Sequence, residues 1–578
     1  MKRSLTYFAA TMMLGSSLLA AAPAYADEAA PAAAAVTAVP AAWYALTDSL
    51  QVQVLGVLNE KSGSGVRLGA AVRIVNNGST TLRIPDHELR LKAADGTVYT
   101  LAPSASNAHG VPAMSEVELV YMKQLDRSKE LKVTDLSLVD VNYDVYPKQE
   151  TVLASVPVGA QVWTGSHSAL SDAAAQLKWG QPFAIPTLKS PLAYKPVSVA
   201  QSMTAQGSAY VVKLLVTNDS EQTETVPQFG IDGKSKTNVY HGTRIETGAV
   251  SLEPGESTYI HYSIPADADT VLESLNVLVL EPFAAADSAG QTKVSAFGLG
   301  KLNISLAGSE EAVPSAAYVF GTPIALEANN SFVNADLQVS LQELHASPSE
   351  ENGSRTVFAK MKLENKGEKP IPVPALQTEL VNGGGGAYSG IRQSAVPASV
   401  QPGTSVIVSY GFVLPLSDTS TSFKLKLQGA LQGDGAAAYR STIAVVPVEL
   451  ESDNDRNAVK LYPYTLNFKT WFVIPVYQGP STYTYSVKLD MDLVREPQVM
   501  LDNNFSTLKI ELIDELGRSI GAKSFPFVGT NRLVSGYQTL SFSGLSLQQA
   551  ESNLTLRISE SIATPNGEMN RIVAELKN

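Results

Sequence analysis

The sequence contains no cysteine among its 578 residues. A chain without thiols cannot form disulfides, zinc–thiolate sites or iron–sulfur clusters, and it offers no cysteine nucleophile. Charged residues make up 17% of the chain and aromatic residues 7%, and acidic residues outnumber basic ones by 55 to 43. This acidic balance argues against nucleic acid as the main partner. Hydrophobic residues still account for 44%, so the chain is not wholly disordered. Because disulfides are excluded, each domain must be stabilised by its own apolar core.

The one long apolar run lies at the N-terminus. Lys2 and Arg3 precede it, and Ala24-Tyr25-Ala26 fits the small-x-small rule of signal peptidase. We expect residues 1–26 to be a signal peptide cleaved after Ala26, which changes the net charge from −12 to −14. The product is then expected outside a bacterial cytoplasm, secreted or associated with the cell envelope, without an integral membrane segment. Residues 27–42 are rich in Ala and Pro and predict a disordered spacer.

Three segments of the chain share a strand that ends in asparagine. Apolar residues alternate at the same four offsets before each Asn, and a polar turn follows it. Because successive side chains in a strand face opposite sides, each set can line one buried face. The three markers are Asn76, Asn218 and Asn365.

A second shared strand ends in tyrosine, 45, 44 and 45 residues after the respective Asn. Pro254-Gly255 and Pro402-Gly403 each begin eight residues before their Tyr and predict a turn with positive φ at Gly. The markers are Tyr121, Tyr262 and Tyr410, whose rings we expect to be packed and whose hydroxyls we expect to bond backbone.

Period and strand pattern together predict an all-β chain of tandem antiparallel β-sandwiches. Dividing the length that remains after signal-peptide cleavage by roughly 150 residues per domain gives three to four domains. The expected division is a signal peptide (1–26), a spacer (27–42), sandwich 1 (43–162), a linker with a short helix (163–192), sandwich 2 (193–306), a linker (307–316), sandwich 3 (317–449) and a divergent β-domain (450–578). The short helix is expected between 168 and 178, with Ser168 or Ser171 as its N-cap.

The pattern resembles bacterial secreted immunoglobulin-like domains of the cell-adhesion-related and telokin-like types. The matching residues are Asn218 with Pro254-Gly255-Glu256-Ser257, and Asn365 with Pro402-Gly403-Thr404-Ser405. The first segment departs at Ala113-Met114, where Pro-Gly is expected. The resemblance covers about residues 45–449 and implies adhesion, envelope organisation or ligand presentation, without a shared catalytic site.

Catalytic and metal-binding motifs are weak. The six histidines form no metal-binding pair, and we expect His261 to lie on the surface. Asp140-Val141-Asn142-Tyr143-Asp144 opens like a calcium loop, but Val145 replaces the required Gly, so a half-exposed strand explains it better. Asp453 and Asp455 are weak calcium candidates in what reads as a solvated linker. We expect no cofactor.

Aromatic residues give the one functional signal, because eight of the 24 residues between 462 and 485 are aromatic. Exposed rings can stack on sugars or anchor an interface, whereas a core or junction cluster is the simpler interpretation. The ligand-binding candidates are Trp471, Tyr477, Tyr462 and Tyr464.

Three functions follow as hypotheses. The first is a non-enzymatic protein that binds a cell-envelope polymer or an extracellular protein. The second is a carbohydrate-binding or enzyme-accessory protein acting through residues 462–485. The third is an extracellular hydrolase using Asp490 and Asp492, which share a strand face, although a solvent-facing edge explains that pair better.

Overall fold

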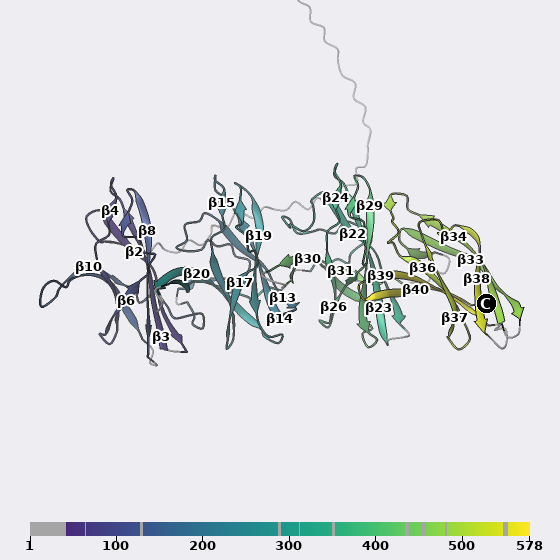
Figure 1. Ribbon diagram of the computed structural model, residues 1–578, viewed down its shortest axis with the longest axis horizontal. Helices are drawn as coiled ribbons and strands as arrows, with labels where there is room; N and C mark the ends of the chain where they lie inside the picture. The colour runs from purple at the N-terminus through teal and green to yellow at the C-terminus, as the bar shows by residue number, and fades with distance from the viewer. Residues whose placement is uncertain are drawn as a thin grey trace, which may run out of the picture.

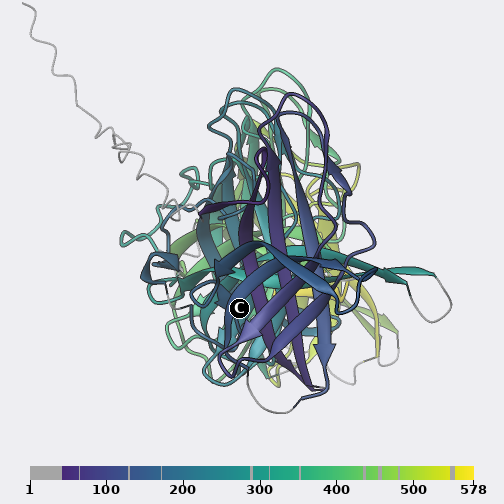
Figure 2. The ribbon, with the colours of Figure 1, turned by 90° about the vertical axis from the view of Figure 1, so that its left-hand side faces the viewer.

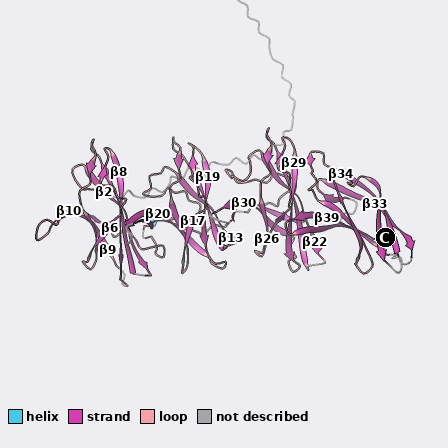
Figure 3. Ribbon diagram, viewed as in Figure 1, coloured by secondary structure: helices cyan, strands magenta, loops and turns pink. Residues whose placement is uncertain are grey.

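The computed structural model describes residues 42–577, apart from gaps at 64, 128–130, 171, 287–290, 311–312, 350–352, 434–437, 453–457, 480–481 and 547–552. The expected signal peptide with Ala26, nearly all of the spacer, and the calcium candidates Asp453 and Asp455 lie outside the described residues. The described chain is all-β and mostly antiparallel, as predicted (Figure 3). Its one helix in these ranges is the 3-10 helix η1, Ala173–Ala175. No helix in the described ranges has the length and apolarity to cross a membrane.

Four apolar cores follow one another along the chain, and each defines one unit of the molecule. The first unit is built from β1 Trp43–Ala45, β2 Leu50–Ser62, β3 Gly65–Asn76, β4 Leu82–Arg83, β5 Glu88–Ala93, β6 Val98–Pro103, β7 Gly110–Val111, β8 Ser115–Leu125, β9 Val133–Asn142, β10 Gln149–Pro157 and β11 Val162–Trp163. The second contains η1, β12 Gln176–Leu177, β13 Ala193–Thr204, β14 Gly207–Thr217, β15 Glu224–Thr225, β16 Phe229–Ser235, β17 Val239–Arg244, β18 Ser251–Leu252, β19 Ser257–Pro265, β20 Leu272–Ala286 and β21 Thr292–Ser305.

The last two units are built from strands in the same way. The third contains β22 Leu337–Ser349, β23 Ser354–Asn365, β24 Ile371–Pro372, β25 Gln377–Asn382, β26 Ala387–Ser389, β27 Ile391–Arg392, β28 Ser399–Val400, β29 Ser405–Pro415, β30 Ser422–Gln432 and β31 Ala438–Glu449. The fourth contains β32 Val459–Leu461, β33 Tyr464–Gly479, β34 Thr482–Arg495, β35 Val499–Met500, β36 Thr507–Ile513, β37 Ser519–Pro526, β38 Gly536–Ser546, β39 Thr555–Thr564 and β40 Gly567–Lys577.

Each unit has two layers around its core; pairing of β6 with β8 and of β17 with β19 joins them into one sheet in the first two units, and they are separate sheets in the last two. The first layer contains a hairpin and a third strand: β2-β3-β8, β13-β14-β19, β22-β23-β29 and β33-β34-β38. The second layer ends in another hairpin, the last of its unit: β5-β9-β10, β16-β20-β21, β25-β30-β31 and β36-β39-β40. Alternating residues of both layers point inward, so each sheet buries one side chain in two in the core.

The same two β-bulges recur in all four units. In the first layer the inserted residue is Leu55, Val197, Gln342 or Lys469. In the last hairpin it is Leu153, Lys301, Ile443 or Val573. A bulge fixes register, because a slip of one residue would turn every side chain to the other face. Equivalent positions can therefore be counted from the bulges in every unit.

The units are arranged in a row (Figure 1). Seen along the row, they lie behind one another, and the teal β20–β21 hairpin projects beyond the sheets (Figure 2). The last hairpin of the second, third and fourth units contacts the first layer of the preceding unit, through β20 on β8, β31 on β13 and β14, and β40 on β22 and β23. We call the part of each last hairpin beyond its bulge the arm, and the side of the first layer turned away from the core the outer face.

The expected linker helix is much shorter than predicted. The α-helix expected between 168 and 178 is only the 3-10 turn η1, and its N-cap is Asp172, which accepts a hydrogen bond from Ala174 N at 2.9 Å. The following residues, Gln176 and Leu177, pair with β21 and so leave the helix for the sheet of the second unit. The tertiary contact with β21 overrides the helix propensity of the alanines.

Candidate functional site

The three marker asparagines occupy one structural position. Each is buried and lies where the second strand of its first layer stops. Each donates its amide to the carbonyl four residues ahead: Asn76 to Thr80 at 2.8 Å, Asn218 to Gln222 at 2.7 Å, and Asn365 to Lys369 at 2.7 Å. Each also donates to a carbonyl 34 or 35 residues ahead and accepts from the backbone N–H two residues on. The asparagines are clamps for a turn and have no polar atom left for a ligand.

The marker tyrosines are buried as well. Tyr262 donates to Phe229 O at 3.1 Å and Tyr410 to Leu376 O at 3.0 Å, as predicted. Tyr121 differs from the prediction, because its hydroxyl lies 2.7 Å from Nε2 of His87, a side chain at the equivalent position. Burial raises the pKa of Tyr410 to about 12 and that of the other two above the usual range. All three are therefore neutral structural groups.

The fourth unit makes one bond of this clamp with a different, exposed residue. Counting from the bulge aligns Arg495 with Asn365, and Arg495 donates to Val499 O, again four residues ahead, at 2.6 Å. The similar sequences around Tyr210 and Tyr485 suggest a different alignment, which is two residues out of register. That alignment pairs the buried Tyr262 with Tyr537, whose side chain is 74% exposed. A shift of two keeps the strand faces in phase, so sequence alternation alone does not detect it.

The junction of the first two units is mostly apolar. Phe297 and Leu299 of the second arm lie against Gly69 and Gly56, where an added Cβ would approach them to 2.9 Å. Two ionisable groups lie beside them, the buried Glu281 and the half-buried Lys301. Burial raises the pKa of Glu281 to about 7 and lowers that of Lys301 to about 8. Both groups are titratable close to neutral pH because the arm takes them out of water.

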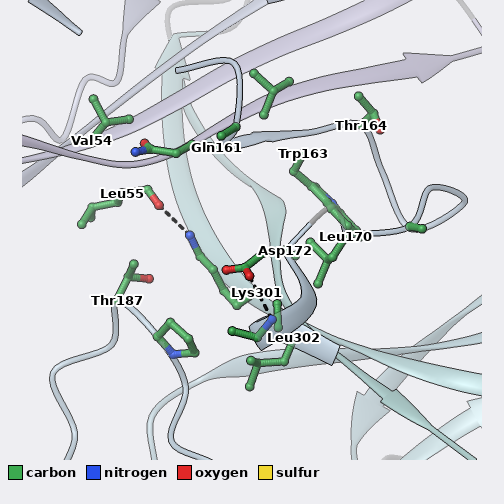
Figure 4. A pocket seen from close by; sticks show the side chains of 17 residues that line it. Val54, Leu55, Gln161, Trp163, Thr164, Leu170, Asp172, Thr187, Lys301 and Leu302 are labelled. Carbon is green, nitrogen blue, oxygen red and sulfur yellow. Dashed lines mark hydrogen bonds between the residues drawn. The ribbon is translucent and has the colours of Figure 1, made fainter. Parts of the chain in front are cut away.

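A cavity of about 240 Å³ opens at this junction (Figure 4). Lys301 donates from its side of the cavity to Leu55 O at 2.6 Å, and Trp163 and Asp172 line the wall. Asp172 is used as the cap of η1. The cavity is thus lined by one amine and by one carboxylate that already accepts a backbone hydrogen bond, and these do not form a nucleophile–base pair. Its lining fits a junction between units better than a catalytic site.

The second junction corrects a prediction made from sequence. His261 is buried, with 4% of its surface exposed, because the third unit covers it. Its Nδ1 lies 2.8 Å from Glu246 and its Nε2 lies 3.0 Å from the Ser441 hydroxyl of the third arm. Lys213 pairs with Glu327 at 2.6 Å and donates to Thr442 O at 2.6 Å. Strand alternation predicted an outward side chain correctly, but it could not reveal that another unit covers that face.

Four charged side chains meet in the third junction, each no more than 3% exposed: Glu343, Lys360, Glu560 and Arg571. Lys360 Nζ lies 2.8 Å from Glu560 and 3.6 Å from Glu343, and Arg571 lies 3.5 Å from both carboxylates. Backbone carbonyls of Tyr462 and Lys460 accept further bonds from the two cations. Burial acts to raise the pKa of Glu560, but Lys360 and Arg571 outweigh it and keep the pKa below the usual range.

The bulges show that these junction residues are equivalent. Lys213, Lys360 and Asp490 stand at one position of the second strand, which Ala71 occupies in the first unit. Two junctions thus place a lysine at the same point of the outer face, under the arm of the next unit. Such buried ions contribute mainly to a fixed geometry, since desolvation offsets most of their attraction.

The aromatic segment is divided between the core and the surface. Tyr464 lies in the fourth core, 4.7 Å from the ring of Phe527, and Trp471 and Tyr462 pack partly against that core. Tyr485 and Phe468 are also core residues. Tyr477 is 63% exposed and Phe472 is 47% exposed. Of the four ligand-binding candidates, only Tyr477 presents most of its ring to solvent.

The candidates for metal and acid–base chemistry do not converge in the described ranges. Asp490 and Asp492 share the outer face of β34, as predicted, and Asp492 pairs with Lys469 at 2.8 Å. Asp140 and Asn142 end β9, with exposed side chains. No group of three or more His, Asp or Glu side chains in the described ranges is arranged to hold a metal ion.

Comparisons with known proteins assign no family. No protein-family model and no curated protein matches the sequence. Dimeric latent PorU from Porphyromonas gingivalis is similar over 68% of this chain and 35% of that chain, at 10% identity and a TM-score of 0.12. The exo-chitosanase CsxA from Amycolatopsis orientalis is similar over 88% of this chain and 92% of that chain, at 10% identity and a TM-score of 0.11. The chain spans about a third of the PorU chain, and TM-scores this low carry no argument about function.

Proposed function

We propose that the chain is a non-catalytic scaffold of tandem immunoglobulin-like sandwiches that acts as a stiff spacer at the bacterial cell surface or in the extracellular matrix. The observation that supports this most is the arm-on-face junction, which joins each unit to the next by the same two elements. Junctions with buried apolar and ionic contacts resist bending more than exposed linkers do, because bending would expose those groups.

The proposed placement at the cell surface is tested by retention. The purified chain from residue 43 is mixed with whole cells and with insoluble cell-wall material, which are then sedimented. A scaffold of the envelope is expected to sediment with one of them. Recovery of all the protein in both supernatants would contradict the placement. The double variant Phe472→Ser with Tyr537→Ser is assayed beside the wild type. Both side chains are exposed, so their loss leaves the core intact.

Carbohydrate binding is the second candidate function, and exposed rings on the fourth unit are what favours it. Phe472 and Tyr537 lie on the outer face, where they can stack on a sugar. Tyr477 lies further along β33. A pull-down on insoluble polysaccharides that is lost on Tyr477→Ala or Phe472→Ala, with unchanged thermal stability, would support this function over the scaffold alone.

A further inference from the structure

The two ends of the row carry the two halves of a junction. At the N-terminal end, the β9–β10 arm points away from the other units (Figure 1). At the C-terminal end lies the outer face of β33, β34 and β38, on which no described residue of a further unit packs. In each of the three internal junctions, the arm of one unit covers the outer face of the unit before it.

The N-terminal arm differs in chemistry from the second and fourth arms. The second arm carries Phe283, Phe297 and Leu299 into its junction, and the fourth arm carries Ile562 and Met569 beside its charged pair. The third arm contacts the second unit through Ser441 and Thr442. Register counted from the bulge places Asp140, Asn142, Gln149 and Thr151 at the corresponding positions of the first arm. All four are exposed. The first arm therefore presents Asn142 and Gln149 where the fourth arm presents Ile562 and Met569.

The C-terminal face has kept apolar character. Strand pairing places Phe472, Lys488, Asp490 and Tyr537 on one side of the sheet, opposite the core residues Val487 and Leu489. Ile474 lies next to them and is 43% exposed, and Tyr537 is 74% exposed. Phe472 and Ile474 are equivalent to His345 and Ser347, which the fourth unit buries in the third junction.

Charge decides which arm this face can accept. In the third junction Glu560 of the arm faces Lys360 of the covered layer at 2.8 Å. The position of Glu560 is Asp140 in the first arm, and the position of Lys360 is Asp490 on the fourth face. A second copy docking in the same geometry would bring two carboxylates together in a desolvated seam, which is strongly unfavourable.

We propose that the outer face of β33, β34 and β38 is the docking site of a β-hairpin arm from a different protein, with apolar residues against Phe472 and Tyr537 and a lysine or arginine opposite Asp490. The face continues the series of junctions already formed in the chain, with the sign of the central charge reversed. The chain's own first arm, with Asp140, is excluded from it. The proposal rests on the shared junction design and not on the cell-surface location, so a chain that binds no cell-wall material can still carry this site.

The chain itself supplies a probe for this face. A triple variant of the first arm is designed for this purpose. Asp140→Lys supplies a cation to face Asp490, and Asn142→Ile with Gln149→Met introduces the apolar residues that the fourth arm has at those two positions. All three positions are exposed, so the first core is unaffected. Sedimentation velocity of the full chain then reports head-to-tail association as a function of concentration. Asp48→Lys, an exposed charge reversal outside the arm, is the control.

The expected result is reversible association of the triple variant at concentrations where the wild type and the control are monomeric. Adding Asp490→Lys should weaken that association by about tenfold or more, because it restores like charges. A triple variant that stays monomeric would overturn the proposal, as would association that is insensitive to Asp490→Lys. Wild-type association that depends on Asp490 would overturn the exclusion of a second copy.

Discussion

At the scale of single residues, buried polar side chains in this chain complete backbone turns or join units. Asn218 satisfies three backbone carbonyls and one backbone N–H, and Arg495 performs part of that work in the fourth unit with a different side chain. A buried polar group without a partner is costly, which explains why the buried Asn218 side chain bonds through both its amide nitrogen and its oxygen. Arg495 is exposed and matches one of these bonds, the one to the carbonyl four residues ahead.

Removing one clamp should be costly in a single unit. Asn218→Ala leaves carbonyls of Gln222 and Leu252 without a donor, and we expect a loss of about 2–3 kcal/mol in the unfolding free energy of the second unit. Differential scanning calorimetry measures it as a lowered transition. The adjacent, exposed Asp219→Ala should change stability by less than about 0.5 kcal/mol. Equal effects of the two substitutions would contradict the clamp.

Glu281 should make stability depend on pH. Its folded pKa of about 7 lies above the ordinary value of 4.5, so its contribution is fully present below pH 4.5 and is lost as the pH rises to about 7. Glu281→Gln removes the charge. The unfolding free energy of this variant should therefore exceed that of the wild type by an amount that grows across that window to about 2–3 kcal/mol. Melting curves at pH 5 and pH 8 measure the difference. The exposed Glu221→Gln is the control, and a pH-independent Glu281→Gln difference would refute the assignment.

Sequence periodicity predicted the strands around Asn76, Asn218 and Asn365 because their alternation reflects burial in a core of their own unit. It failed for His261, which faces outward and is buried by a different unit. It also failed at Arg495, because the hydrogen bond to the fourth carbonyl ahead does not require asparagine. Contacts between units join residues more than a hundred positions apart, and no local pattern records them.

At the scale of elements, the last hairpin of the second, third and fourth units has two roles. Its part before the bulge belongs to its own core, whereas its arm lies on the preceding unit. The bulge lets one continuous pair of strands change its surroundings, since it bends and twists the ladder locally. Gly411 shows how close the approach is, because an added Cβ would lie 2.6 Å from Met569 of the fourth arm.

The ionic junction between the third and fourth units gives a test of coupling. Lys360→Met leaves two buried carboxylates with Arg571 alone and should cost about 3–5 kcal/mol. Adding Glu560→Gln should recover much of that loss, so the two changes are strongly non-additive. Calorimetric transitions of the chain report both values. The exposed Lys424→Met is the control, and simple additivity would contradict a shared network.

Two aromatic residues of strand β33 should respond differently to truncation. Trp471→Ala removes a ring that packs on the fourth core and should lower stability by about 1–3 kcal/mol. Tyr477→Ala removes a mostly exposed ring and should cost less than about 0.5 kcal/mol. Urea unfolding of the two variants separates these outcomes, and a larger loss for Tyr477→Ala would contradict the placement of the core.

At the scale of the whole molecule, three junctions of one design set the distance between the ends of the row (Figure 1). The absence of cysteine, which excluded disulfides, means that packing alone holds the units in place. It also makes the chain suited to thiol labelling, because every introduced cysteine is unique.

Spin-label distances between equivalent turns test the stiffness of the spacer most directly. Ser79, Glu221 and Glu368 each lie three residues after a clamp asparagine and are exposed. The pairs S79C with E221C and E221C with E368C, measured by double electron–electron resonance, should each give one narrow distance distribution that salt does not broaden. Broad distributions, like those of domains on flexible linkers, would contradict the claim that the arms lock the units into a stiff row.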